Sequence, residues 1–251
     1  ERIAVVSVEQ AQLPPADFDL VTMSHVLEHL PGPVDVLRNV AHWLRPGGRL
    51  RIWLPNVESL ESRIFRRYWF GLDVPRHLYH FAPRTIELAL ERAGLSLVEL
   101  RPQLQASSLA GSVSHLAGAV RHRETTTHSS PGYYASLPVA SLAAAAGGAA
   151  VMDVVAARRC RAVARNASGV DRPIRLAALA AGPVFYQAPL YRRLAADPRV
   201  DLTVLFASAG GVRPYDAGFG AGAVAWDVDL LEGYRAEFLA SAETNNVLGG
   251  F

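Results

Sequence analysis

The fold is decided by two stretches of the sequence, FDLVTMSHVLEHL at residues 18–30 and LRPGGRLRIWLPN at residues 44–56. Phe18–Met23 is a near-continuous apolar run, as expected for a strand that is covered on both faces. Pro33 suits the first turn of a helix, and apolar residues then recur at helical spacing up to a Pro-Gly-Gly turn. Leu50–Leu54 is a second buried strand. This order of strand, loop, helix and strand predicts one α/β unit of an open parallel sheet.

Further elements are expected on both sides of this unit. Ile3–Val8 reads as a short strand, and Leu95–Leu100 as a later one. Thr85 is a candidate cap for a helix that Gly94 ends. The Ala-rich stretch at residues 137–157 predicts a packed or membrane-surface helix, because its uninterrupted apolar run is much shorter than the about 20 residues of a membrane span.

The composition indicates a folded protein and sets limits on its partners. Of the 251 residues, 50% are hydrophobic and 19% are charged, which favours a packed core over disorder. The net charge of +2 is too small to argue for nucleic acid. Cys160 is the only cysteine, so no internal disulfide is possible, which fits a reducing cytosol. We therefore expect a cytoplasmic protein, with the Ala-rich stretch allowing peripheral contact at the inner face of the membrane.

A domain boundary is expected after the Ala-rich stretch. An Arg-rich polar segment predicts a linker at residues 161–172. The strand–turn–helix–strand pattern then restarts with Ile174–Ala180 and Val200–Phe206, which we interpret as a new βαβ unit and not as a continuation of the first sheet. The expected division is thus a first domain at residues 1–160 and a second at residues 173–251.

The first domain resembles the C-terminal part of class I S-adenosylmethionine-dependent methyltransferases. The motifs that carry the resemblance are FDLV at residues 18–21 leading into HVLEH at 25–29, LRPGG at 44–48, DVPRHLYHF at 73–81 and RAGL at 92–95. The likeness is greatest to the methyltransferases found beside polysaccharide biosynthesis enzymes. It implies a Rossmann-like sheet, S-adenosylmethionine as cofactor, and a glycan, lipid-linked sugar or related polar molecule as acceptor.

Ligands of such sheets lie at the carboxyl ends of the strands. The resemblance places cofactor contacts after two strands, at Ser7, Val8, Ser24, His25 and Leu27. Relatives often carry an acidic residue where this chain has Ser7, so the adenine contact there departs from the pattern.

Methyl transfer to a hydroxyl benefits from a general base, for which a histidine near neutral pKa is suited. We predict His29 or His77 in this role. The alternative is that the motif at residues 76–81 is a packing signature whose histidines are satisfied by hydrogen bonds.

His25, Glu28 and His29 have the i, i+3, i+4 spacing of one helical face, and His77 and His80 offer further nitrogens. In some relatives a Glu-His pair at this position binds a divalent metal, whereas in others it caps and braces the next helix. We expect the structural role, and so no metal.

The second half resembles the start of a GT-B glycosyltransferase. The resemblance is carried by GPVFYQAPLY at residues 182–191, VDLTVLF at 200–206, YDAGFG at 215–220 and WDVDLLEGY at 226–234. It implies an acceptor-binding domain, with the nucleotide-sugar donor bound only in a full-length parent. The expected fold is therefore α/β throughout, a partial Rossmann-like methyltransferase sheet followed by a partial Rossmann-like GT-B N-terminal domain.

The sequence thus predicts a glycan-modifying methyltransferase joined to a glycosyltransferase module. The competing hypothesis is a catalytically silent fragment, or a scaffold that binds glycan or a partner. It follows from the expectation that the chain is a fragment at both ends, lacking the glycine-rich cofactor loop and the nucleotide-sugar domain.

Overall fold

The computed structural model describes residues 11, 13–103, 105–121, 148–159, 172–180, 187–206, 215–216, 223–224 and 229–238. The strand expected at Ile3–Val8, and with it Ser7 and Val8, lies outside these ranges. So do residues 161–171 of the linker expected at residues 161–172.

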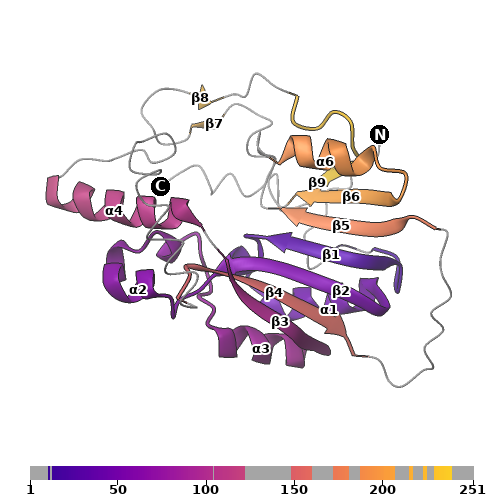
Figure 1. Cartoon of the computed structure of the whole chain (residues 1–251), viewed down its shortest axis with the longest axis horizontal. Coiled ribbons are helices and arrows are strands. Elements are labelled where there is room, and N and C mark those ends of the chain that lie inside the picture. The colour runs from indigo at the N-terminus through magenta and orange to yellow at the C-terminus, as the bar shows by residue number, and fades with distance from the viewer. Residues whose placement is uncertain are drawn as a thin grey trace.

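The described strands form a seven-stranded mixed sheet with the order β3-β4-β2-β1-β5-β6-β9, which Figure 1 shows edge to edge. The strands are β1 (Phe18–Ser24), β2 (Leu44–Pro55), β3 (Leu95–Gln103), β4 (Val151–Arg158), β5 (Ile174–Ala180), β6 (Val200–Phe206) and β9 (Ala236–Phe238). β1 pairs in parallel with β2 and β5, and the pairs β5–β6 and β6–β9 are also parallel. Only β4 is antiparallel to its neighbours β2 and β3. Two short strands, β7 (Tyr215–Asp216) and β8 (Ala223–Val224), form a separate pair.

The helices are α1 (Pro33–Trp43), α2 (Leu60–Phe65), α3 (Pro83–Arg92), α4 (Ala106–Arg121) and α6 (Ala188–Ala195), with short 3-10 turns η1 (Leu27–His29), η2 (Arg66–Tyr68) and η3 (Phe70–Leu72). α1 begins at the predicted Pro33. α3 begins two residues before Thr85, whose Oγ1 accepts a hydrogen bond from the Ala82 N–H at 2.8 Å. None of the helices in the described ranges is long and apolar enough to cross a membrane.

Two expectations are wrong in this architecture. Val151–Arg158 is a strand instead of part of an Ala-rich helix, because it is paired on both sides, with β2 and with β3, and its β-branched valines suit that position. The second unit does not build a sheet of its own. β5 pairs with β1 from Leu20↔Leu176 to Ser24↔Ala180, so the first sheet continues across the expected boundary.

Two cores cover the opposite faces of this sheet. On one face α1 packs on Val21 and Met23 of β1, together with Ala177 and Leu179 of β5. Residues from both halves of the chain therefore share one core. The other face has a smaller core, in which Tyr191 of α6 packs with alternate residues of β5 and β6, namely Leu176, Ala178, Ala180, Leu202, Val204 and Phe206.

Candidate functional site

The loop that follows β1 begins with a residue in an unusual backbone conformation. His25 has φ of 51°, in the left-handed region that non-glycine residues seldom adopt. Its N–H donates to the carbonyl oxygen of Trp53 at 3.0 Å, and its Nδ1 lies 3.2 Å from Oε1 of Glu28. These two contacts hold the conformation, which directs the chain from the end of β1 into η1. Backbone conformations of this kind concentrate at functional sites.

Glu28 is a buried carboxylate at the centre of this region. Its side chain is 1% exposed, and Oε2 has no hydrogen-bond partner among the described residues. The Glu28 carbonyl oxygen accepts hydrogen bonds from the N–H groups of Leu78 and Tyr79, at 2.8 and 3.1 Å. These bonds fasten the loop at residues 73–81 onto η1, and they bring the second predicted histidine to the first.

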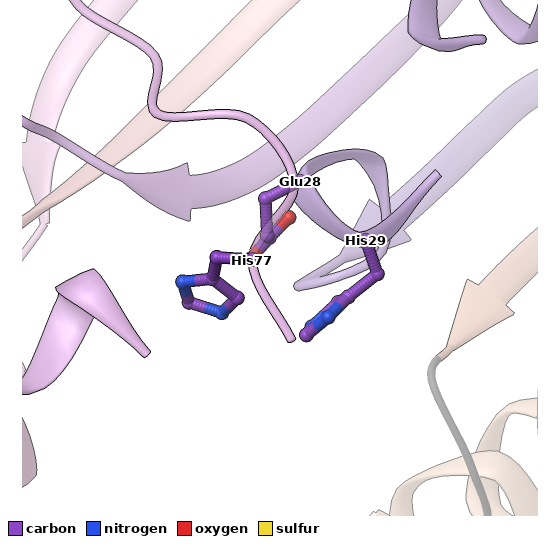
Figure 2. Close-up of side chains that lie close together, drawn as sticks. All are labelled: Glu28, His29 and His77. Carbon is purple, nitrogen blue, oxygen red and sulfur yellow. The ribbon is translucent and has the colours of Figure 1, made fainter. Parts of the chain in front are cut away.

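Glu28, His29 and His77 form one cluster, with a ligand-capable atom of each lying within 4.8 Å of the others. Figure 2 shows the three side chains converging, two from η1 and one from the later loop. The two imidazole rings meet edge to face, with their centroids 4.7 Å apart. We call this group the Glu28–His29–His77 cluster.

Backbone carbonyls determine which ring nitrogens carry the protons. Nδ1 of His29 lies 3.0 Å from the carbonyl oxygen of Arg76, and Nδ1 of His77 lies 2.9 Å from that of Gly71. A carbonyl can only accept, so each neutral ring carries its proton on Nδ1 and presents a basic Nε2. Nε2 of His77 also lies 3.8 Å from a carboxylate oxygen of Asp73. Both predicted bases therefore have a nitrogen that can take up a proton.

The charges in the cluster support this arrangement. Burial works to raise the pKa of Glu28, but the hydrogen bond from His25 and the charges of His25 and His29 hold that pKa below its usual value. Burial also lowers the pKa of His77, against the opposing effect of the Glu28 charge. At neutral pH the cluster consequently holds a carboxylate beside a neutral His77, which is the state a general base requires.

Within the described ranges, the Glu28–His29–His77 cluster is the group that could hold a divalent cation. It would offer one carboxylate and two imidazoles as ligands. The alternative expectation is that Glu28 and His29 cap and brace the next helix. α1 has no side-chain cap hydrogen bond, and it is the backbone carbonyl of Glu28 that holds the loop at residues 73–81. His80 lies outside the group, and its Nε2 is hydrogen-bonded to the carbonyl oxygen of Leu72 at 2.8 Å.

The structure separates the predicted cofactor residues. Ser24 and His25 lie at the carboxyl end of β1, where ligands of such sheets are found. Leu27 is fully buried in the main core. Glu28 was considered in the sequence only as a metal or helix-bracing residue. The sequence offered one signal for its importance, since Glu28 lies between His25 and His29. Its complete burial depends on the tertiary structure and could not be read from the sequence.

Comparisons with known proteins agree with the first half of the sequence interpretation. Residues 2–100 match the family model described as a methyltransferase domain. A ubiquinone biosynthesis O-methyltransferase from Aeromonas salmonicida (strain A449) is 48% identical over 44 residues, 18% of either chain. Its namesake from Xanthomonas euvesicatoria pv. vesicatoria (strain 85-10) is 30% identical over 107 residues, which are 40% of this chain and 45% of that protein. The matches thus span less than half the length of these relatives.

Among solved structures, a putative methyltransferase from Bacillus halodurans C-125 superimposes with a TM-score of 0.40 at 15% identity, over 61% of this chain and 70% of the other. The family match ends at residue 100, so it gives the glycosyltransferase resemblance of the second half no support. Residues 2–100 are thus similar to a methyltransferase domain, and the curated relatives that match part of the chain are described as O-methyltransferases.

Proposed function

We propose that this chain transfers a methyl group from S-adenosylmethionine to a hydroxyl group, with His77 as general base. The observation that carries the proposal is the Glu28–His29–His77 cluster, which lies directly after the carboxyl end of β1. Methyl transfer depends mainly on holding the acceptor in line with the methyl group, and a base adds to this when the acceptor is a hydroxyl.

Each residue of the cluster has a defined part in this reaction. S-adenosylmethionine supplies a methyl group on a positively charged sulfur. With the cofactor bound, Nε2 of His77 would take up the proton of the acceptor hydroxyl as that oxygen accepts the methyl group, and the sulfur of the cofactor would retain the electron pair of its bond to the methyl carbon. Glu28 stabilises the imidazolium that forms, because its negative charge raises the pKa of His77. The ring of His29, edge to face with His77, positions that base.

The names of the curated relatives support an oxygen acceptor, since both are described as O-methyltransferases of ubiquinone biosynthesis. An aromatic hydroxyl is therefore the acceptor that we propose first. The glycan acceptor expected from the sequence is the second candidate, carried by the resemblance to polysaccharide-associated methyltransferases.

The test is methyl transfer by the full chain from radiolabelled S-adenosylmethionine, with a polyprenyl catechol and a hydroxyl-bearing oligosaccharide offered in parallel. His77→Gln is expected to lower kcat/KM by about 10²–10⁴-fold, the usual contribution of a general base. His42→Gln, at the exposed end of α1, is the matched control and should retain activity. Transfer to the oligosaccharide alone would replace the aromatic acceptor by the glycan. A chain that methylates neither acceptor would match the silent-fragment hypothesis.

The pH profile separates a base from a structural histidine. Because burial lowers the pKa of His77 below 6.5, kcat/KM should rise with pH up to that lowered pKa and stay level above it. His77→Gln should lose the rising limb. If the variant kept the limb with a lower plateau, His77 would not be the base.

A further inference from the structure

The described sheet winds outward in two directions from its centre. From β1 the chain passes through α1 to β2 on one side, and from β5 it passes through α6 to β6 on the other. β1 and β5 are themselves adjacent and parallel, which Figure 1 shows at the middle of the sheet. The two connecting helices cover opposite faces, since α1 packs on Val21 and Met23 whereas α6 packs on Ala178 and Ala180.

This arrangement is a topological switch point between β1 and β5. Helices that leave two neighbouring strands for opposite faces leave a crevice outside the carboxyl ends of those strands, and ligands of open α/β sheets bind there. The two strand ends lie side by side, because Ser24 is the register partner of Ala180. The strained His25 follows Ser24, and the Glu28–His29–His77 cluster begins three residues after His25.

Ion pairs at the opposite, amino end fasten β5 in this position. Asp19 is 10% exposed, and each of its oxygens accepts a hydrogen bond from the second half of the chain. Oδ1 accepts from Nη2 of Arg172 at 3.0 Å, and Oδ2 accepts from the backbone N–H of Arg175 at 2.9 Å. The Arg175 guanidinium also pairs with Asp17. Charge-assisted bonds of this kind are the stronger ones, so the register between β1 and β5 is specified by side chains as well as by the ladder.

We propose that residues 172–180 and 187–206, which lie beyond the family match, supply the second wall of the S-adenosylmethionine site, opposite the wall formed by Ser24 and His25. The inference rests on the proposed function for the identity of the ligand. It gives a structural role to a segment that the sequence assigned to a different enzyme. It also means that the cofactor site, expected from the sequence to be incomplete, has a wall on each side of the switch point within this chain.

Photoaffinity labelling of the full chain tests the proposal. The probe is S-adenosylhomocysteine carrying an azide on its adenine ring, with unmodified S-adenosylhomocysteine as competitor. Trypsin cleaves after arginine and thereby separates the walls, because Ile3–Arg38 holds the end of β1 and Leu176–Arg192 holds the end of β5. We expect competitor-sensitive label in both peptides.

The outcomes distinguish this inference from the proposed function. Competitor-sensitive label in Ile3–Arg38 but not in Leu176–Arg192 would overturn the second wall and leave the methyltransferase proposal intact. Label in both peptides without methyl transfer to any acceptor would contradict the proposed reaction but support the second wall. A chain that does not take up the probe at all would overturn the second wall together with the cofactor assignment.

A pair of variants on β5 gives an independent measurement. Ala180 and Ala178 are both buried on the α6 face, but only Ala180 is at the carboxyl end beside Ser24. Ala180→Val and Ala178→Val add the same volume, so they should lower the melting temperature to a similar extent. We expect Ala180→Val alone to raise the Kd for S-adenosylhomocysteine, by about tenfold. Equal Kd values for the two variants would contradict the proposal.

Discussion

At the scale of single residues, the unusual feature is a carboxylate that remains charged while almost completely buried. Burying an ionised carboxylate is costly unless it is paired and hydrogen-bonded. For Glu28 that compensation comes from His25 and His29, which together hold its pKa below the usual value in spite of burial. The same charge acts on His77, so Glu28 links the stability of this loop to the chemistry proposed for it.

The contribution of the Glu28 carboxylate to stability should appear in the pH dependence of unfolding. Its pKa is lower in the folded protein than the 4.5 of the unfolded chain, so its contribution is present above about pH 4.5 and is lost as pH falls through the folded pKa. Glu28→Gln should therefore unfold with a shallower pH dependence than the wild type below that pH, measured by denaturant melts. Glu91→Gln, at an exposed position of α3, is the control and should keep the wild-type slope. Parallel slopes for wild type and Glu28→Gln would contradict the assignment.

At the scale of elements, the region around the site depends on close approach. α4 packs against α2 and η3, with Ser108 Oγ donating to Glu61 at 2.7 Å and Ser112 Oγ accepting from the Phe70 N–H at 2.9 Å. A Cβ at Gly111 would lie 2.4 Å from the Phe70 ring, so this glycine is required for the approach. The contact matters for the site because η3 includes Gly71, whose carbonyl holds His77.

Gly111→Ala tests this packing, because the change in the free energy of unfolding should have the opposite sign to that in an unhindered helix. In an unhindered helix the change stabilises by up to about 1 kcal/mol. Here the clash with Phe70 should instead destabilise the protein by about 1–3 kcal/mol. Val113→Ala, 49% exposed on the same helix, should change stability by less than about 0.5 kcal/mol. A Gly111→Ala protein as stable as the wild type in urea melts would show that α4 does not pack so closely.

A second test at this scale concerns the attachment of β5 to β1. Asp19→Ala leaves Arg172 and the Arg175 N–H without their acceptor and also removes an ion pair with Arg45 of β2. It should lower the free energy of unfolding by about 1–3 kcal/mol. Glu87→Ala removes a more exposed pair with Arg84 and should cost less than about 0.5 kcal/mol. Equal losses in the two variants would mean that the Asp19 bonds hold β1 neither to β5 nor to β2.

At the scale of the whole molecule, the described parts of both halves belong to one sheet and one main core. Leu179 of β5 and Leu205 of β6 are buried in the same core as α1 and α3. Elements that share a core cannot unfold separately without exposing it. The molecule should therefore behave as one cooperative unit, in contrast to the two domains that the sequence led us to expect.

Calorimetry of the full chain should show a single unfolding transition. Leu179→Ala should shift that entire transition, with a loss of about 2–5 kcal/mol, because it leaves a cavity where the halves meet. Ile174→Ala, on the same strand but 51% exposed, should have a small effect. Two separate transitions, with Leu179→Ala moving only one of them, would restore the two-domain interpretation.

Much of the local structure follows from the sequence. The apolar run of β1, the proline that begins α1 and the restart at Ile174–Ala180 all specify elements that the structure confirms, since propensity and periodicity act over neighbouring residues. The candidate bases His29 and His77 lie in two of the motifs that carry the methyltransferase resemblance. The strand β4 was not predicted, because an Ala-rich segment becomes a strand only when partners on both sides are available.

What the sequence by itself determined is thus most of the local elements and the methyltransferase resemblance, together with two candidate bases, His29 and His77. The tertiary structure decided that His77 reaches Glu28 across 49 residues, and that β5 pairs with β1 instead of starting a new sheet. The physical reason is the same in both cases. Parallel pairing and the burial of a charge join residues that are far apart in the chain, and no local pattern encodes which partner is chosen.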